Sequence, residues 1–435
     1  MLVFEFKTYG KAAQFKAVDE AIRTTQFIRN KAIRLWMDGQ AKSWVELSKH
    51  CALLAKEWTF ADKLNSMARQ AAAERAWAAI SRFYDNCRKK CSQQLQPGGS
   101  LQALRHEPSG NQKALERSGL RAPGKKSFPK FQKDCRSVEY KTSGWKLSDD
   151  RKSINFTDKH GIGRLKLKGT RDLNFYQINQ IKRVRLVKRA DGVYVQFCVS
   201  ADRNEQVEPS GSAVGLDVGL NHYYTDSNGL TVENPRFLRR GEKTLRLSQK
   251  RVSRKILGSN NRRKARRILG KRHLKISRQR KDFAVKLARC VITSKDVVAY
   301  EDLRVKNMVK NHCLAGSIND ASWYQFRVWL EYFGKVFRKI TIAVPPNYTS
   351  QECSSCGVIV KKSLSTRTHI CQCGCTLDRD ENAARNILSR GLSTVGHTGT
   401  FMLDMSNALG ESTSTLAEEI LPEQVDSQIK ESSSL

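Results

Sequence analysis

The sequence predicts a multidomain α+β protein. Three observations support this prediction. Apolar and polar residues alternate near the start of the chain and near position 190, and apolar residues recur at helical spacing between these two regions. From about residue 213 to residue 344 the pattern then follows the order strand, hairpin, helix, strand, helix, strand. A length of 435 residues leaves room for roughly two to four domains with their own cores.

The N-terminal part combines a strand with helices. Residues 1–10 alternate between apolar and polar side chains, which is typical of a strand. Residues 16–37 and 64–83 carry apolar side chains at steps of three and four, which predicts two amphipathic helices. The apolar stripes indicate core packing, whereas the polar faces could also border nucleic acid through Arg23, Arg29, Lys31, Arg34, Arg82, Arg88 and Lys89.

Strand patterns resume after a loop. Residues 97–129 are rich in Gly, Pro, Ser and Lys, which indicates a loop or linker. Residues 185–200 contain two alternating runs around an Asp-Gly pair at 191–192, which is a strong hairpin signal. We therefore expect residues 1–10 and 125–205 to form one β-domain that is interrupted by the helical insert.

The third region mixes strands and helices. Residues 213–230 predict three successive strands, the last one following a Ser-Asn-Gly turn. Residues 239–281 predict two antiparallel basic helices with a tight turn at Gly258–Asn261. Next come a strand at 296–303, an aromatic-rich helix at 321–337 and a strand at 340–344.

Charge indicates the class of partner. The formal net charge is +36 and the isoelectric point is near 10.0, which favours a long polyanion bound through its phosphates. A membrane surface is the rival polyanion, but no apolar run approaches the roughly 18 residues that span a bilayer. The first ten residues lack the layout of a signal peptide, so a cytoplasmic protein is expected. In that compartment the twelve cysteines are thiols or metal ligands rather than disulfides.

Paired cysteines predict one structural Zn²⁺. Cys353 and Cys356 form a C-x2-C pair that is followed by a glycine, which is typical of a zinc knuckle. The second half is irregular, because it offers only C-x-C spacings. We expect Cys371 and Cys373 to complete the site, since a glycine follows them too, with Cys375 as a possible substitute for either. A ligand role for His369 is less favoured, and the scattered cysteines Cys51, Cys87, Cys91, Cys135, Cys198, Cys290 and Cys313 are expected to be structural.

Three carboxylates from separate segments are candidate catalytic residues. Asp217 and Glu301 lie at the ends of apolar strands, and Asp380 begins a predicted helix. A buried carboxylate is costly unless it is paired or binds a metal, so the three could converge on two Mg²⁺ ions about 3.5–4 Å apart and hydrolyse a phosphodiester. Each could instead be a turn former, an ion-pair partner or a helix cap. Of the neighbouring acids, alternation along the strand disfavours Asp302, and Asp378 lies further from the helix start. The set favours a nuclease of the RNase H type.

The basic helices form a candidate surface for nucleic acid. Residues 239–281 contain nineteen Lys and Arg residues against a single acid, Glu242. Such a surface contacts phosphates rather than bases, so it carries little sequence specificity. The candidate contact residues are Arg251, Arg254, Lys255, Asn261, Arg263, Lys264 and His273.

Several motifs together resemble a known family. In order, they are GLDVGL, SQKRVSRKILGSNN, RQRKDFAVKLA, VAYEDLRVKNM, PNYTSQECSSCG and CGCTLDRDENAARNIL, within residues 214–390 or directly beside them. They resemble the TnpB proteins of bacterial insertion sequences, which are related to the type V CRISPR effector nucleases. SFPKFQ and the Asp-Gly hairpin are similar to the family's β-domain. The C-x-C spacing departs from the family's usual C-x2-C.

The resemblance implies an RNA-guided DNA endonuclease with a RuvC-like (RNase H-type) α/β nuclease domain, an inserted zinc ribbon, and a β-barrel domain interrupted by a helical recognition domain. Asp217, Glu301 and Asp380 would be its acidic triad. The implied segments are the first β-strand (1–12), helical recognition domain (13–122), β-barrel or wedge-like domain (123–210), nuclease domain (211–349), zinc ribbon (350–376), last nuclease helix (377–391) and a tail (392–435) that its composition predicts to be disordered.

The implied partners are a guide RNA from the transposon end and double-stranded target DNA next to a short motif. No membrane partner is expected, the cell would be prokaryotic with the protein at its nucleoid, and the oligomeric state is not assigned. Three alternatives stay open: an RNA-guided DNA-binding regulator that does not cut, a transposase that joins strands itself, and a miniature type V CRISPR effector. Guide pairing would supply sequence choice, so charge and recognition of A-form shape suffice for the protein.

Overall fold

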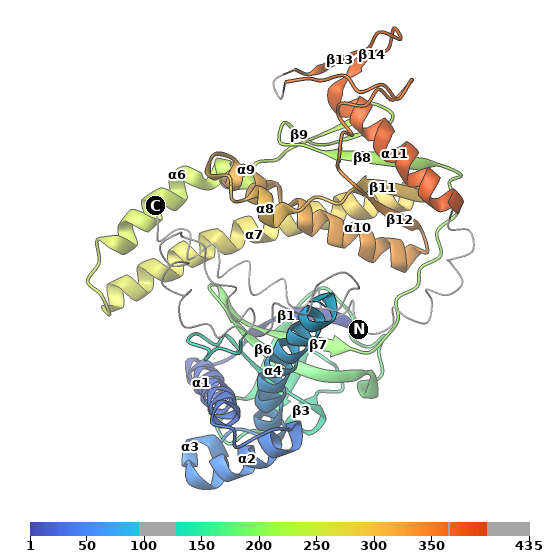
Figure 1. Ribbon diagram of the computed structural model, residues 1–435. Coiled ribbons are helices and arrows are strands. Elements are labelled where there is room, and N and C mark those ends of the chain that lie inside the picture. Colours follow the sequence, from blue (N-terminus) through green and yellow to red (C-terminus); the bar gives the residue numbers. More distant parts are fainter. Residues whose placement is uncertain (95–127, 364–365, 398–435) are drawn as a thin grey trace, which may run out of the picture. The chain divides into compact units, whose positions relative to one another are not determined.

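The computed structural model describes residues 1–94, 128–363 and 366–397, in two compact units, Met1–Asp202 and Arg203–Leu435 (Figure 1). The expected disordered tail from residue 392 lies outside the described residues except for residues 392–397, which are helical and continue the last helix beyond its expected end at 391. Nearly all of the expected loop at 97–129 also lies outside the described residues. Within the described residues, no helix combines the length and apolar character that a membrane crossing requires.

The first unit contains a seven-stranded sheet in the order β2-β6-β7-β1-β5-β4-β3. Its pairings are antiparallel, and β1 lies between β7 and β5. The barrel form implied by the family resemblance stays a prediction, because the ladders between the described strands leave this order open at both ends. The strands are β1 (Leu2–Tyr9), β2 (Ser137–Tyr140), β3 (Trp145–Leu147), β4 (Ser153–Phe156), β5 (Gly163–Lys168), β6 (Ile181–Arg189) and β7 (Gly192–Val199).

The hairpin predicted at the Asp-Gly pair is confirmed. β6 and β7 pair from Arg189↔Gly192 onward, and the inward side chains of β7 are buried. Short 3₁₀ turns at Thr142–Gly144 and Ile178–Gln180 complete the connections. Glu139 on β2 is 3% exposed and pairs with Arg183 and Arg185 of β6 at 2.8 and 2.6 Å, which satisfies a carboxylate that burial would otherwise destabilise.

Along the sequence, helices lie between β1 and the other strands of this sheet. They are α1 (Ala12–Met37), α2 (Trp44–Glu57), α3 (Thr59–Asp62) and α4 (Ser66–Gln94). The stripe predicted for the first helix is buried, including Val18, Ala21 and Ile28. α2 and α3 were not predicted from the sequence, although Ser43 caps α2 by accepting a hydrogen bond from the Glu46 backbone.

The second unit is built on a mixed five-stranded sheet in the order β10-β9-β8-β11-β12. The strands are β8 (Ala213–Val218), β9 (His222–Asp226), β10 (Thr231–Glu233), β11 (Val297–Glu301) and β12 (Ile340–Val344). β8, β9 and β10 are antiparallel neighbours, as the predicted hairpin requires, whereas β11 runs parallel to both β8 and β12. The parallel pairs are joined by long helical crossovers, which such pairs need.

Helices cover both faces of this sheet (Figure 1). α7 (Asn260–Ser294) and α10 (Trp323–Phe337) pack against one face, where Leu216 and Tyr300 belong to the shared apolar core. α11 (Arg379–His397) packs against the other face, where its Ile387 contacts Ala299 and Val344. The result is a three-layered α/β arrangement.

The remaining elements extend from this core. α6 (Phe237–Ser253) packs along α7, and the short helices α8 (Val305–Met308) and α9 (His312–Ala321) precede α10. The helix expected at 321–337 begins two residues later, because Ser322 takes a left-handed conformation with φ of 56° and separates α9 from α10. β13 (Thr368–Ile370) and β14 (Thr376–Asp378) form a two-stranded sheet beside the cysteines.

Candidate functional site

Asp217 and Glu301 lie on the same face of adjacent strands. β8 and β11 are parallel with Leu216 opposite Tyr300, and each acid is the next residue on its strand. Since Leu216 and Tyr300 face the core formed with α7 and α10, alternation turns the two acids toward the face that α11 covers. The strand ends therefore bring together two carboxylates that are 84 positions apart in the sequence.

Asp380 reaches this face from the first turn of α11. The helix can approach β8 closely because residue 215 is a glycine: a Cβ atom there would lie 2.1 Å from the carbonyl oxygen of Ala384. Asp378 Oδ1 accepts hydrogen bonds from the backbone N–H of Asp380 at 2.8 Å and of Glu381 at 3.4 Å. Asp378 therefore caps the helix, which leaves the carboxylate of Asp380 available for other contacts.

The three carboxylates affect one another electrostatically. Burial raises the pKa of Asp217 well above its usual range, and the nearby charges of Glu301 and Asp380 raise it further. Burial also raises the pKa of Glu301, against a hydrogen bond from Thr349 and the charge of Arg390. A divalent cation would relieve this repulsion, and carboxylate oxygens are the ligands that a hard cation prefers. The donor set thus fits Mg²⁺.

The acids are not arranged as tightly as the cysteines described below. Among the described residues, no three carboxylates have oxygens that all lie within 4.8 Å of one another. Asp380 is held by Arg379 at 3.1 Å and by Arg367 at 3.3 Å. Asp302, the rejected neighbour on the strand, is 55% exposed and pairs with Arg327 instead.

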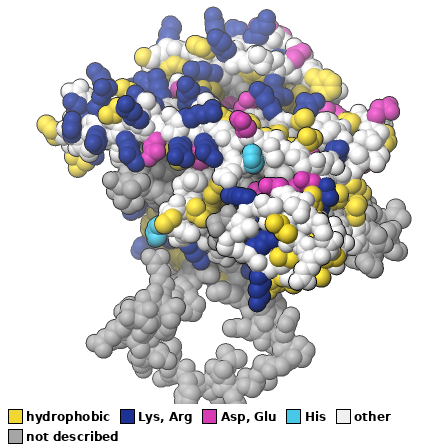
Figure 2. Space-filling model, turned by 90° about the horizontal axis from the view of Figure 1, so that it is seen from above, with side chains coloured by type: hydrophobic (Ala, Val, Ile, Leu, Met, Phe, Trp, Pro, Cys, Tyr) yellow, Lys and Arg dark blue, Asp and Glu magenta, His cyan; other side chains and the backbone are white. Residues whose placement is uncertain are grey.

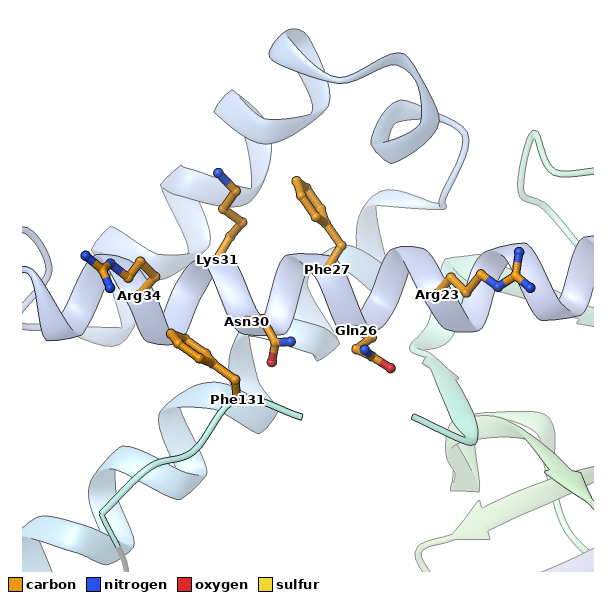
Figure 3. A pocket seen from close by; sticks show the side chains of 7 residues that line it. All are labelled: Arg23, Gln26, Phe27, Asn30, Lys31, Arg34 and Phe131. Carbon is orange, nitrogen blue, oxygen red and sulfur yellow. The ribbon is translucent and has the colours of Figure 1, made fainter. Parts of the chain in front are cut away.

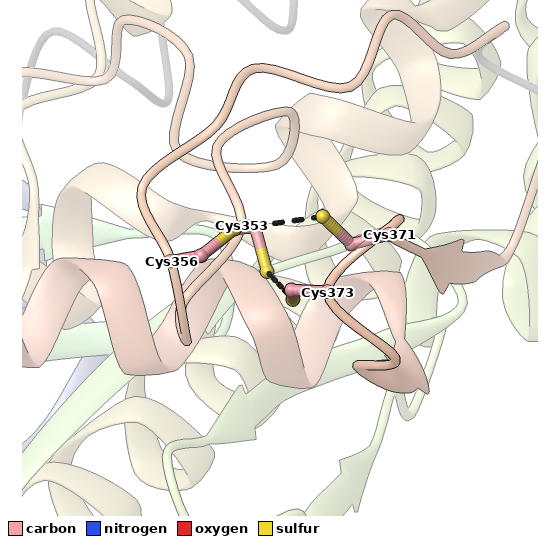
Figure 4. Close-up of side chains that lie close together, drawn as sticks. All are labelled: Cys353, Cys356, Cys371 and Cys373. Atoms are coloured by element: carbon pink, nitrogen blue, oxygen red, sulfur yellow. Dashed lines mark hydrogen bonds between the residues drawn. The ribbon is translucent and has the colours of Figure 1, made fainter.

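Four cysteines meet in a second cluster (Figure 4). The Sγ atoms of Cys353, Cys356, Cys371 and Cys373 all lie within 4.8 Å of one another, with Cys353 and Cys373 at 3.7 Å and Cys356 and Cys371 at 3.6 Å. Tetrahedral zinc with Zn–S bonds of about 2.3 Å places its sulfurs about 3.8 Å apart. The four thiols can therefore hold one metal ion, and their spacing fits zinc.

Tight turns shape both halves of this cluster. Gly357 and Gly374 follow the cysteine pairs with φ of 77° and 87°, a left-handed conformation that favours glycine. Each donates its N–H to the carbonyl of the first cysteine of its pair, Cys353 or Cys371, at 2.9 and 3.0 Å. The C-x2-C half thus closes a five-residue turn and the shorter C-x-C half a four-residue turn, and each turn ends at a left-handed glycine.

Cys375 and His369, the other candidate zinc ligands from the sequence, lie outside the group of four. Cys375 accepts a hydrogen bond from the Cys371 N–H through its carbonyl, and its sulfur does not join the group. His369 is completely buried and contacts Lys362 through Nδ1. Burial would raise the pKa of Cys353, but hydrogen bonds from the Cys356 and Ser355 backbones lower it to about 5, which suits a metal-binding thiolate.

The two basic helices α6 and α7 form an antiparallel hairpin, which we call the arm. The turn between them places Gly258 at φ of 81°, and the Ser259 side chain caps α7 by accepting a hydrogen bond from the Arg262 N–H. Figure 2 shows Lys and Arg side chains crowded over this region. Of the predicted contact residues, His273 is half-buried, and burial lowers its pKa, while the exposed ones are Arg251, Arg254, Lys255, Asn261, Arg263 and Lys264.

Some arginines of the arm are structural, which their residue type alone does not reveal. Arg262 donates to the carbonyls of Val252 at 3.2 Å and Lys255 at 2.9 Å, and so closes the end of α6. Arg280 forms a buried pair with Asp320 of α9 at 2.9 Å. Not every cation in this segment is therefore free for phosphates.

A hollow of about 430 Å³ lies along α1 in the first unit (Figure 3). It is lined by Arg23, Gln26, Phe27, Asn30, Lys31, Arg34 and Phe131. Asn30 and Gln26 hold residues 132–135 against the helix through backbone hydrogen bonds of 2.8 and 2.9 Å. Cations and aromatic rings thus lie together on the polar face of α1, which the sequence suggested could also border nucleic acid.

Family comparisons match two regions of the chain. Residues 196–312 match the family described as "Probable transposase", and residues 323–387 match the family described as "Cas12f1-like, TNB domain". The first region contains the elements from β8 to α7, which include the arm. The second region runs from α10 through the cysteine cluster into α11.

Curated relatives match over longer stretches. "Putative RNA-guided DNA endonuclease InsQ" of Escherichia coli K12 is 31% identical over 283 residues, which cover 61% of this chain and 69% of that protein. A "Putative RNA-guided DNA endonuclease" of Streptomyces pristinaespiralis is 40% identical over 42% of this chain and 46% of its own length, so the match spans about half of that relative. "TnpB-like protein L79" of Acanthamoeba polyphaga mimivirus is 29% identical over 31% of this chain and 27% of its own.

Solved structures resemble the chain only distantly. A Cas12f1-sgRNA-target DNA complex has 14% identity and a TM-score of 0.45, covering 89% of this chain and 98% of that one. The mini-RNA-guided endonuclease CRISPR-Cas_phi3 has 12% identity and a TM-score of 0.47, covering 89% and 92%. Similarity at this level does not establish a shared fold.

Proposed function

The chain belongs to the TnpB family, and from this membership we propose that it is an RNA-guided DNA endonuclease of a transposable element. It cuts double-stranded DNA that a guide RNA from the transposon end selects by base pairing next to a short motif. Its partners are that RNA and the target DNA, and in a prokaryotic cell it acts at the nucleoid. The two curated relatives named as RNA-guided DNA endonucleases support this proposal.

The convergence of Asp217, Glu301 and Asp380 carries the proposal of cleavage. The first two occupy one face at the ends of parallel strands, and the third starts the helix on that face. These three residues would hold two Mg²⁺ ions, which supply an activated water and stabilise the leaving oxygen of the phosphodiester. The RuvC-like assignment of this domain rests on the same acids and on the order of the sheet.

The protein itself contributes by holding the charged groups of the site in position. The strand register holds the Asp217 and Glu301 carboxylates side by side before substrate arrives, so little rearrangement is needed at the moment of reaction. Arg367 and Arg379 orient Asp380 in the absence of other partners. Partial burial of Asp217 and Glu301 lowers the local dielectric constant, which strengthens the electrostatic interactions within the site.

The cysteine cluster and the arm serve the same activity in different ways. Zinc on Cys353, Cys356, Cys371 and Cys373 would be structural, because four protein ligands leave no open position for chemistry. Exposed cations of the arm would contact phosphates of the guide–target duplex. A protein of this kind recognises shape and charge, and base pairing supplies the sequence specificity.

RNA sequencing and plasmid cleavage test this proposal. We expect the purified protein to carry a defined RNA that extends from a transposon end, and to cut a matching plasmid in Mg²⁺ when the adjacent motif is supplied from a randomised library. Asp217→Ala should abolish cleavage while RNA binding persists.

Four outcomes would contradict the proposal. Heterogeneous copurifying RNA would indicate a non-specific binder. Cleavage that survives Asp217→Ala would place the catalytic metals elsewhere. Target binding without any cleavage by the wild-type protein would favour a regulator, and strand joining of transposon ends without RNA would favour a transposase.

A further inference from the structure

Glu301 receives a hydrogen bond from a residue outside the acidic triad. Thr349 Oγ1 donates to Glu301 Oε1 at 2.6 Å, and Thr349 is only 4% exposed. Thr349 lies in the segment between β12 and the first cysteine pair, 48 positions from Glu301. A neutral hydroxyl that donates to a half-buried carboxylate stabilises its charged form and fixes which oxygen points away.

Thr349 is itself held from α11. The side-chain amide of Asn386 donates to the carbonyl oxygen of Thr349 at 2.8 Å and to that of Glu352 at 2.7 Å. Asn386 is 6% exposed, so these bonds satisfy a buried amide that would otherwise be costly. The backbone of Thr349 is therefore tied to the same helix that carries Asp380.

A second asparagine one turn earlier repeats this contact. Asn382 is completely buried, donates to the Glu352 carbonyl at 2.7 Å and accepts from the Ser354 N–H at 2.9 Å. Asn382 and Asn386 are four residues apart, so they lie on one face of α11. Together they clamp residues 349–354 onto the helix in a single register.

We propose that Thr349 and Asn386 are positioning residues of the nuclease site: Asn386 holds Thr349, and the Thr349 hydroxyl aims the Glu301 carboxylate toward the cations shared with Asp217 and Asp380. The proposal rests on the proposed function. It explains why the start of the cysteine-bearing segment is bonded to α11 rather than left as a loose loop. The alternative is that the hydroxyl only satisfies local structure and has no effect on cation binding.

Substitutions that alter a single hydroxyl separate these two roles. Thr349→Val removes the donor at nearly constant shape, and Thr349→Ser keeps it. Thr293→Val is the matched control, because the Thr293 hydroxyl bonds only carbonyls of its own helix, at 2.9 and 3.0 Å. Where Thr349→Val fails to fold, Thr349→Ala removes the same hydroxyl without crowding the site.

Two measurements are needed on the RNA-bound protein. Mn²⁺, as a probe of the acidic site, is titrated and the free ion is followed by electron paramagnetic resonance. Cleavage of a matching plasmid is measured over a range of Mg²⁺ concentrations. We expect Thr349→Val to weaken Mn²⁺ binding about tenfold and to shift the Mg²⁺ dependence equally, with target binding unchanged. Thr349→Ser and Thr293→Val should behave like the wild type.

The outcomes distinguish the two proposals. Wild-type protein that neither binds Mn²⁺ at the acids nor cleaves would overturn the proposed function itself. Wild-type activity with unchanged Mn²⁺ binding in Thr349→Val would overturn the positioning role alone. An equal loss in Thr349→Ser and Thr349→Val would also overturn it, because the hydroxyl would then not be the group that matters.

Discussion

The substitution Gly215→Ala tests whether the close approach of α11 to β8 sets the position of Asp380. In Gly215→Ala the new methyl group would lie 2.1 Å from the Ala384 carbonyl oxygen, 2.7 Å from the Leu388 nitrogen and 2.9 Å from Leu388 Cβ. Two of these contacts are backbone atoms, so rotation of a side chain cannot relieve them. The helix must move away by more than about 1 Å to restore ordinary van der Waals contact.

A displacement of this size has two consequences. Overpacking in a tight interior costs about 1–3 kcal/mol, which lowers the Tm of a unit of this size by about 2–12 °C. Moving α11 also moves Asp380 away from Asp217 and Glu301, and a misplacement of about 1 Å can cost about a hundredfold in rate. We therefore expect cleavage to fall about a hundredfold while RNA binding is retained.

Single-turnover cleavage and thermal unfolding of the RNA-bound protein measure these effects. Gly316→Ala is the matched control, because a Cβ atom there meets nothing within 4 Å and the residue lies in α9. That variant should be as stable as the wild type or slightly more stable. Wild-type cleavage and an unchanged Tm in Gly215→Ala would refute the argument that this contact positions the helix.

Three further predictions concern the two units separately. Asp320→Ala leaves Arg280 buried without its partner, so the free energy of unfolding in urea should fall by about 3–5 kcal/mol. Burial acts to raise the pKa of Glu139, but nearby arginines lower it overall, so Glu139 stabilises the fold above its unfolded pKa near 4.3. Glu139→Gln should therefore lose about 1–3 kcal/mol at pH 7, and the difference from wild type should vanish as the pH falls through the lowered pKa, measured by urea unfolding across pH. Cys373→Ser should lose bound zinc, measured by plasma mass spectrometry, whereas Cys375→Ser should keep one zinc per chain.

Each of these predictions has a result that would contradict it. Asp282→Ala breaks an exposed pair with Lys286 and should change stability by less than about 1 kcal/mol. If Asp320→Ala lowered the free energy of unfolding by no more than Asp282→Ala does, burial of the Arg280–Asp320 pair would be unimportant for stability. If the difference in free energy of unfolding between Glu139→Gln and wild type persisted at acidic pH, the charge of the carboxylate would not be the source of that difference. Zinc retained in Cys373→Ser would indicate that Cys375 replaces it.

Local features of the chain were predictable from sequence because they depend on neighbouring residues. The hairpin follows from alternation and an Asp-Gly pair, and the arm follows from helical spacing broken at Gly258. The choice of Glu301 over Asp302 needed only the alternation of side chains along a strand. The glycines after each cysteine pair were likewise recognisable, since a left-handed turn favours that residue.

Other features depended on contacts between distant segments. Nothing in the residues around Thr349 reveals that its hydroxyl meets Glu301, because that contact exists only once the segment is clamped to α11. Arg262 and Arg280 have the same local composition as the exposed arginines of the arm, and only packing assigns them structural roles.

The sequence by itself determined the charge of this protein, its strand and helix periods, its candidate acids and its cysteine pairs. These properties are carried by residue type and short-range spacing. The tertiary structure alone decided which face Asp217 and Glu301 share and how close α11 comes at Gly215. It also excluded Cys375, which the sequence had left open as a substitute for the expected ligands Cys371 and Cys373. The physical reason is that strand register and close packing are set by interactions between segments far apart in the chain, where a shift of about 1 Å separates contact from clash.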